Sequence, residues 1–149
     1  MAKLQLTPSS LAKGLLTFIG LSRALFGVGC VVTPSLGMKF LGLANMSTEA
    51  AILCRMFGVR EIVVGGFLLI AERGRQATAK RGGTVAQQGA GDDEVRRAIW
   101  WNVATDGLDA AAIAVSFAQD SLEGLVFAKM LTTALVYFAA GLQTAWFYS

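Results

Sequence analysis

The stretch IWWNVATDGLDAAAIAVSF, residues 99–117, decides how the rest of the chain is interpreted. It is apolar along nearly its whole length, yet it carries two acids, Asp106 and Asp109. As a helix, at about 1.5 Å per residue, it comes close to spanning the hydrocarbon core of a bilayer. The spacing of the two acids places them on one helix face, one turn after Asn102. An ionised carboxylate near the bilayer centre costs at least about 2.5–3.5 kcal/mol, so both acids are expected to face a cavity or a cationic partner.

The composition of the whole chain is typical of an integral membrane protein. Of its 149 residues, 54% are hydrophobic and only 15% are charged, whereas a soluble domain has about 25% charged residues. The chain has no histidine, which excludes an imidazole base, an HExxH zinc site and a histidine-ligated haem. Its two cysteines, Cys30 and Cys54, lie in apolar runs and are too few for a disulfide framework or a CxxC redox motif. We therefore expect one transmembrane domain with no metal and no cofactor.

Four apolar segments predict an all-α, up-down-up-down bundle of four transmembrane helices, at approximately 11–33, 49–71, 95–117 and 122–146. Between the second and third segments, residues 73–94 show no hydrophobic period and are predicted to form a mobile loop. The single Arg-Gly-Gly triplet of this loop has no aromatic neighbour, so no nucleic-acid partner is expected. Most basic residues outside the spans fall on the side of the amino terminus, which places both termini in the cytoplasm. In a eukaryotic cell the expected location is the endoplasmic reticulum membrane.

Eight charged residues lie within or beside the predicted spans, and their signs balance: Arg23, Arg55, Arg60, Lys129, Glu61, Asp106, Asp109 and Glu123. Such a balance is expected when charges pair inside a bundle, because a single charge facing lipid is far costlier. Arg23 or Arg60 is expected to meet Asp106, and Lys129 to meet Asp109 or Glu123. One face of the second span collects Cys54, Gly58, Glu61, Gly65 and Glu72.

The acids on a common face indicate acid–base chemistry. Burial and a nearby arginine can leave one of two neighbouring carboxyl groups neutral and the other ionised, so that one donates a proton and the other accepts one. The candidate catalytic groups are Asp106, Asp109 and Glu61. The candidate substrate-binding groups are Arg23, Arg55, Arg60, Asn102 and Lys129. The structural alternative is that the ion pairs only fix the register of the helices, a role that is attested for buried polar groups.

Residues Arg55–Glu61, RMFGVRE, followed by Gly65 or Gly66, resemble the R-x-F-G-x-R-[DE]-x-x-x-G signature of small four-span membrane proteins. These proteins are grouped as DoxX-like and related families of unknown function. The D-x-x-D spacing of the two aspartates and the Gly27…Pro34 end of the first span match the same pattern, whereas residues 73–94 look like an insertion. The resemblance implies a four-helix membrane bundle. Because fungal relatives lie beside natural-product pathways, it also points to secondary metabolism.

Three functions of different classes remain open at this stage. The first is a cofactor-independent acid–base enzyme, either an isomerase, a cyclase or an epoxide-opening enzyme, acting on a lipophilic small molecule. The second is a small transporter in which Glu61 or Asp106 exchanges a proton against a hydrophobic solute, for which so short a chain needs to form a homo-oligomer. The third is a structural or assembly subunit of a membrane complex, held by Arg55, Lys129 and the outer acids. The lipid bilayer is a partner in all three.

Overall fold

The computed structural model describes residues 10–40, 47–119 and 124–148, and within these ranges the chain is helical and contains no strand. The helices are α1 (Ser10–Val32), α2 (Pro34–Phe40), α3 (Thr48–Lys80), α4 (Val85–Ala118) and α5 (Gly124–Phe147). The all-α prediction is confirmed, but the described residues form five helices where four were predicted. The extra helix is the short α2, which begins at Pro34. Proline suits the first position of a helix, where its missing N–H would have no partner.

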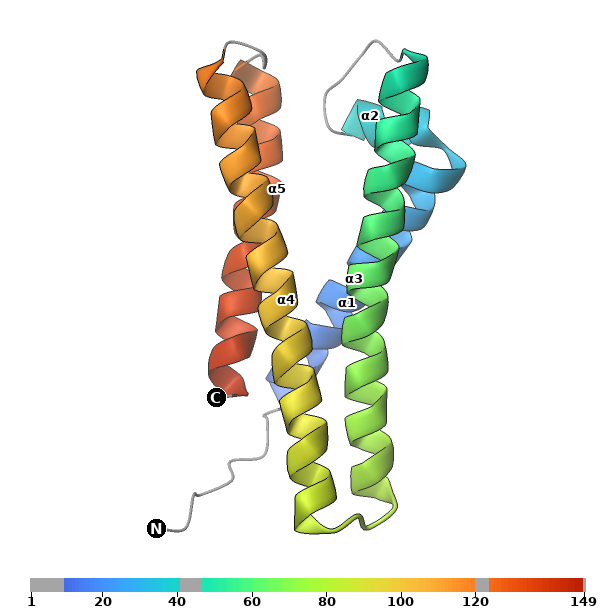
Figure 1. Ribbon diagram of the computed structural model, residues 1–149, viewed down its shortest axis with the longest axis vertical. Helices are drawn as coiled ribbons and strands as arrows, with labels where there is room; N and C mark the ends of the chain where they lie inside the picture. The colour runs from blue at the N-terminus through green and yellow to red at the C-terminus, as the bar shows by residue number, and fades with distance from the viewer. Residues whose placement is uncertain (1–9, 41–46, 120–123, 149) are drawn as a thin grey trace.

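The helices are arranged in two pairs. Helix α1 packs against α3, and α4 packs against α5. Helices α3 and α4 converge toward their short connection at 81–84 and diverge toward the opposite end of the molecule, where α2 lies (Figure 1). The space between the diverging ends is the region in which the candidate site is found.

Glycines bring the backbones of α1 and α3 into direct contact at two levels. A Cβ atom at Gly27 would lie 2.4 Å from the carbonyl oxygen of Gly58, and one at Gly65 would lie 2.5 Å from that of Gly20. Both distances are shorter than any real Cβ contact, so a side chain at either position would push the helices apart. Small residues at a helix interface permit this close approach. The α1–α3 pair is therefore antiparallel and locked by backbone contact.

The predicted mobile loop at 73–94 is wrong, because α3 continues to Lys80 and α4 already begins at Val85. The segment lacks an apolar period and contains several glycines, but its alanines, glutamines and arginines favour helix by intrinsic propensity. Thr84 caps α4, and a reciprocal capping box with Gln87 satisfies the first backbone N–H groups. Gly82 takes a positive φ of 66°, which allows the tight connection between the two helices.

Two apolar clusters lie at opposite ends of the α1–α3 pair. The larger cluster fills the end where α1 begins and α5 finishes: Ala12, Leu16, Ile19, Leu68, Val95, Ile99, Val103, Ala145 and Tyr148. The smaller one, Cys30, Met38 and Cys54, lies under α2. Both cysteines are buried free thiols. Between these clusters the interior is charged.

Candidate functional site

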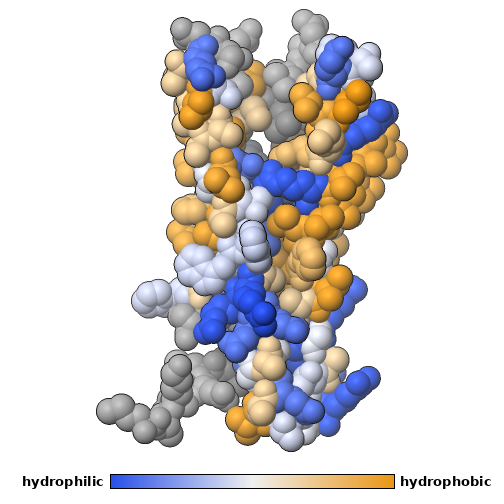
Figure 2. Space-filling model, in the orientation of Figure 1, coloured by the Kyte–Doolittle hydropathy of each residue, from blue (hydrophilic) through white to orange (hydrophobic). Residues whose placement is uncertain are grey.

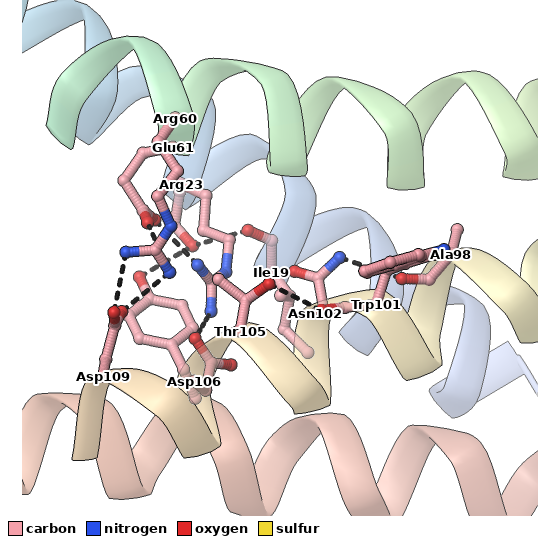
Figure 3. A network of polar contacts seen from close by, with 12 residues as sticks. Ile19, Arg23, Arg60, Glu61, Ala98, Trp101, Asn102, Thr105, Asp106 and Asp109 are labelled. Carbon is pink, nitrogen blue, oxygen red and sulfur yellow. Dashed lines mark hydrogen bonds and ion pairs between the residues drawn. The ribbon is translucent and has the colours of Figure 1, made fainter. Parts of the chain in front are cut away.

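Arg23 is the centre of the charged interior. Its guanidinium donates from Nη1 to Glu61 Oε2 at 2.8 Å, and from Nη2 to Asp106 Oδ1 (Figure 3). The three residues come from α1, α3 and α4, and they are only 2%, 4% and 3% exposed, respectively. One guanidinium is thus shared by two buried carboxyl groups. The predicted meeting of Arg23 with Asp106 is present.

A second ion pair lies beside this triad and is partly exposed. Arg60 donates from Nη1 and Nη2 to the two oxygens of Asp109, at 2.8 and 2.7 Å. This bidentate geometry is the strong form of an arginine–carboxylate pair. Arg60 Nη2 also lies 3.9 Å from Glu61 Oε1, which connects the pair to the triad.

Aromatic rings hold both guanidinium groups in place. The Arg23 guanidinium carbon lies 4.7 Å from the centre of the Tyr137 ring, and that of Arg60 lies 5.5 Å from the Phe57 ring. These are cation–π distances. The Tyr137 hydroxyl donates to Ser22 Oγ at 3.1 Å, which ties α5 to α1 beside the triad. Tyr137 was missed in the sequence, although it lies one turn after Thr133 and in line with Thr144 on α5.

The charges of the triad and of the second ion pair do not balance. Two guanidinium groups, Arg23 and Arg60, face three carboxyl groups, Glu61, Asp106 and Asp109, so full ionisation leaves a net charge of 2 − 3 = −1. In addition, Glu61 Oε1 and Arg23 Nε are buried and have no hydrogen-bond partner among the described residues. We call the five residues Arg23, Arg60, Glu61, Asp106 and Asp109 the charged floor.

The charged floor closes one end of a cavity of about 750 Å³ between the two helix pairs. Arg23, Glu61, Asp106 and Asp109 line it, together with mainly apolar walls that include Phe26, Met38, Leu53, Ile113 and Met130. Figure 2 shows the corresponding gap between the two helix pairs in the upper half of the molecule. The volume is in the range of sites for drug-sized ligands. The arrangement can hold a lipophilic molecule with its reactive group at the floor.

On its other side, Asp106 also lines a second, very small cavity of about 10 Å³, together with Asn102 and Thr144. This volume is about that of one water molecule. Asn102 donates to the carbonyl oxygen of Ala98 at 3.1 Å, while its Oδ1 is buried without a hydrogen-bond partner among the described residues. Asn102 therefore lies behind Asp106 and away from the walls of the large cavity.

Two predicted substrate-binding residues lie elsewhere. Arg55 and Lys129 are exposed and are not part of the cavity walls. Asp109 pairs with Arg60 rather than with Lys129, and Glu123, the other expected partner of Lys129, lies outside the described residues. Among the described residues, no three cysteine, aspartate or glutamate side chains are placed to hold one metal ion.

No family model, curated protein or solved structure matches this chain. The site therefore has to be interpreted from its own chemistry.

A separate polar cluster lies just beyond the end of the predicted second span. Glu72 is buried and accepts from Arg75 Nε and Nη2 at 2.8 and 2.7 Å, from Gln76 at 2.8 Å and from the Tyr148 hydroxyl at 3.3 Å. Burial by itself would raise the pKa of Glu72, but the hydrogen bonds from Arg75 and Gln76 outweigh it, and the pKa lies below its ordinary value. The cluster fastens the end of α5 to α3.

We expect Glu72→Gln to lower the free energy of unfolding at pH 7 by about 1.5–3 kcal/mol, since it removes charge-assisted hydrogen bonds. A carboxyl whose pKa is depressed in the folded state stabilises above its unfolded pKa, about 4.3, and this stabilisation disappears as the pH falls through the folded value. The difference between wild type and variant should therefore vanish in strong acid, as measured by thermal unfolding in detergent. Asp93→Asn, which breaks an exposed pair with Arg96, is the matched control and should change stability by at most about 1 kcal/mol. A Glu72→Gln effect no larger than this control would contradict the prediction.

Proposed function

We propose that this chain is an integral membrane protein in which α1, α3, α4 and α5 cross the bilayer as an up-down-up-down bundle. Two helical segments, Ala12–Val32 and Gly124–Phe147, are long and apolar enough to cross a membrane. The core helix of a soluble protein can have the same composition, but such a helix is mostly buried. Here only 33% and 17% of the two apolar windows are buried, so their apolar side chains point outward. The same four-span architecture is implied by the resemblance of residues 55–66 to the DoxX-like proteins.

The two remaining long helices fit this proposal because buried acids and exposed apolar side chains lie on different faces of each helix. On α3, Glu61 is buried in the charged floor, whereas Met56, Phe67 and Ile70 are well exposed. On α4, Asp106 is buried and Leu108 is exposed. Exposed apolar surface of this extent marks contact with a membrane or a partner. Lipid around the bundle would cover it.

The proposed topology has both termini in the cytoplasm, and the location in a eukaryotic cell is the endoplasmic reticulum membrane. We expect a cysteine introduced at Gly83, in the α3–α4 connection, to react with a membrane-impermeant maleimide only from the cytoplasmic side. A cysteine at Glu49, at the start of α3, should react only from the other side. Wild type is the control, since Cys30 and Cys54 are buried. Labelling of both sites from one side would contradict this topology.

Within this architecture, we propose that the protein is an enzyme that performs acid–base chemistry, with no bound cofactor, on a lipophilic small molecule. The observation that carries the proposal is the charged floor, with its excess of one carboxyl group, at the end of an apolar cavity. An uncompensated charge at this depth is costly, so the floor is most stable when it holds one proton. That proton lies in the triad, where Glu61 and Asp106 compete for Arg23. The Arg60–Asp109 pair is already balanced.

The proposed reaction returns every proton that it uses. The protonated triad delivers its proton to a carbon–carbon double bond or to an epoxide oxygen of the substrate. The cation that results loses a proton from a neighbouring carbon to the remaining carboxylate, which moves the double bond or leaves an unsaturated alcohol from the epoxide. In a cyclisation, the electron pair of a second double bond of the substrate first attacks the cation and forms the ring bond, and the new cation then loses the proton to the carboxylate. Arg23 and Arg60 stabilise the negative charge on the floor during this interval. The floor ends in the state in which it began, so neither a metal nor a cofactor is consumed.

This function can be tested without knowing the substrate. We expect the purified protein, incubated in D₂O with a lipophilic extract of the cells that produce it, to introduce deuterium into carbon-bound positions of at least one compound. Mass spectrometry of the extract measures the incorporation, and boiled protein is the control. A proton given to an epoxide oxygen leaves no deuterium on carbon, so the extract is also analysed for isomerised epoxides. Neither incorporation nor isomerisation above that control would contradict the acid–base proposal and would favour a structural subunit.

A further inference from the structure

We infer that the cavity recognises a lipophilic monocation, which it binds with the positive charge at the charged floor. This inference rests on the proposed function, since it names the class of molecule that the same site accepts.

The charged groups of the floor come from three of the four long helices: Arg23 on α1, Arg60 and Glu61 on α3, and Asp106 and Asp109 on α4. The fourth, α5, contributes the uncharged ring of Tyr137, which lies over Arg23. The net charge of the charged floor with all five groups ionised is −1. An anionic ligand would double this buried charge, and a neutral ligand would leave it unchanged. A monocation cancels it, so the floor favours a ligand of charge +1.

Glu61 supplies a second, independent indication. The residue is 4% exposed and lines the cavity, and its Oε1 atom has no hydrogen-bond partner among the described residues. Arg60 Nη2, a cationic neighbour of this oxygen, lies at 3.9 Å, which is beyond a hydrogen bond. A buried carboxylate oxygen with an unused acceptor lobe is costly unless a donor or a cation meets it. Oε1 is thus an oxygen of the charged floor whose acceptor capacity is unused, and it belongs to a residue that lines the cavity.

The walls of the cavity favour a lipophilic body for the rest of the ligand. They are mainly apolar and include the rings of Phe26, Phe57 and Tyr137. Aromatic rings attract organic cations, and an apolar wall excludes the water that a small hydrated ion would retain. A volume of about 750 Å³ accommodates a drug-sized molecule. These features together favour an organic cation with a lipophilic body over an inorganic ion.

The same charge count connects binding with the proposed reaction. When a neutral substrate takes the proton of the floor, the substrate becomes a monocation and the floor becomes −1. The proton carries one positive charge to the substrate and leaves one negative charge on the floor. The cationic intermediate therefore remains paired with the floor. A stable monocation resembles this intermediate and is expected to bind in its place.

The experiment compares two ions of nearly the same size and shape, tetraphenylphosphonium and tetraphenylborate, by titration calorimetry of the purified protein. We expect the cation to bind at least about tenfold more tightly than the anion, which corresponds to about 1.4 kcal/mol. Repeating the titration in two buffers of different ionisation enthalpy should show about one proton released for each cation bound. Equal affinity for the two ions, or tighter binding of the anion, would overturn the inference.

Glu61→Gln tests whether the floor is responsible, because it removes one negative charge and keeps nearly the same shape. The preference for the cation should then be lost. Lys80→Gln also changes the net charge of the chain by one unit, but at an exposed position near the end of α3, and it should retain the preference. If Glu61→Gln does not fold, as judged by its melting curve, Asp106→Asn makes the same change in charge. A preference that survives both floor substitutions would overturn the inference.

The number of protons released separates this inference from the proposed function. A cation that binds preferentially, but releases no proton, would support cation recognition and contradict the proton held for catalysis. Deuterium incorporation in the D₂O experiment, together with no preference between the two ions, would support the acid–base function and contradict cation recognition.

Discussion

Arg23→Leu is expected to lower the free energy of unfolding by about 3–5 kcal/mol, which is the range for breaking a buried ion pair by removing one partner. Arg23 is the only residue with a hydrogen bond to both Glu61 and Asp106 among those described. Without it, two carboxyl groups at 4% and 3% exposure lose the cation that they share, and Asp106 loses its ion pair. Thermal unfolding in detergent, followed by circular dichroism, measures the loss.

Two further variants identify the cause of this loss. Arg23→Lys keeps the charge, but a single ammonium group lacks the fork that reaches both carboxyls, so an intermediate loss is expected. Adding Glu61→Leu and Asp106→Leu to Arg23→Leu removes all three charges and should restore much of the stability, since buried ion pairs can be replaced by apolar residues at little cost. An Arg23→Leu protein that melts like wild type would contradict the buried position of the triad.

Asp106→Asn is expected to have the opposite profile, with an intact fold and little remaining deuterium incorporation. The structure explains why the fold should survive. The floor has one carboxyl group too many, so removing one leaves Arg23 paired with Glu61 and Arg60 paired with Asp109. The asparagine keeps the shape of the side chain, and its oxygen still accepts from Arg23. The proton of the triad is lost, however, and general acid–base catalysis typically contributes about 10²–10⁴-fold in rate.

Asp109→Asn is compared with Asp106→Asn under the same conditions. It breaks the bidentate pair with Arg60, while leaving the triad intact, so it should retain more incorporation than Asp106→Asn. Melting temperature and deuterium incorporation are measured on both variants. An Asp106→Asn protein that melts far below wild type but exchanges normally when cooled would contradict the catalytic role. One that is intact and inert would contradict a purely structural role.

The inward face of α3 could be predicted from the sequence, because helical spacing determines which residues share a face. Cys54, Gly58, Glu61, Gly65 and Glu72 were assigned to one face, and all five are buried. The partners of the charged residues could be predicted only in part, since depth does not determine the rotation of a helix about its axis. Lys129, an expected partner of Asp109, is exposed on α5, and Asp109 pairs with Arg60 instead.

The error at residues 73–94 has a different origin. The expectation of a loop assumed that a helix needs an apolar stripe, which holds only where the helix packs on a core. Here the ends of α3 and α4 contact each other through polar groups, as Arg75 Nη1 does with Asp92 Oδ1 at 3.8 Å. Intrinsic propensity and a capping box are then enough to continue both helices. Neither feature appears as hydrophobic periodicity.

The glycine contacts between α1 and α3 bear on how this protein can diversify. A Cβ at Gly65 would lie 3.0 Å from the Arg23 Cβ, so the backbones themselves determine where Arg23 lies relative to Glu61. The apolar walls of the cavity, by contrast, are formed by side chains such as Leu53, Ile113 and Met130. Substitutions in the walls change the shape of the space without moving the charges. The shape of the cavity can therefore change residue by residue, while the glycines keep the charged floor in place.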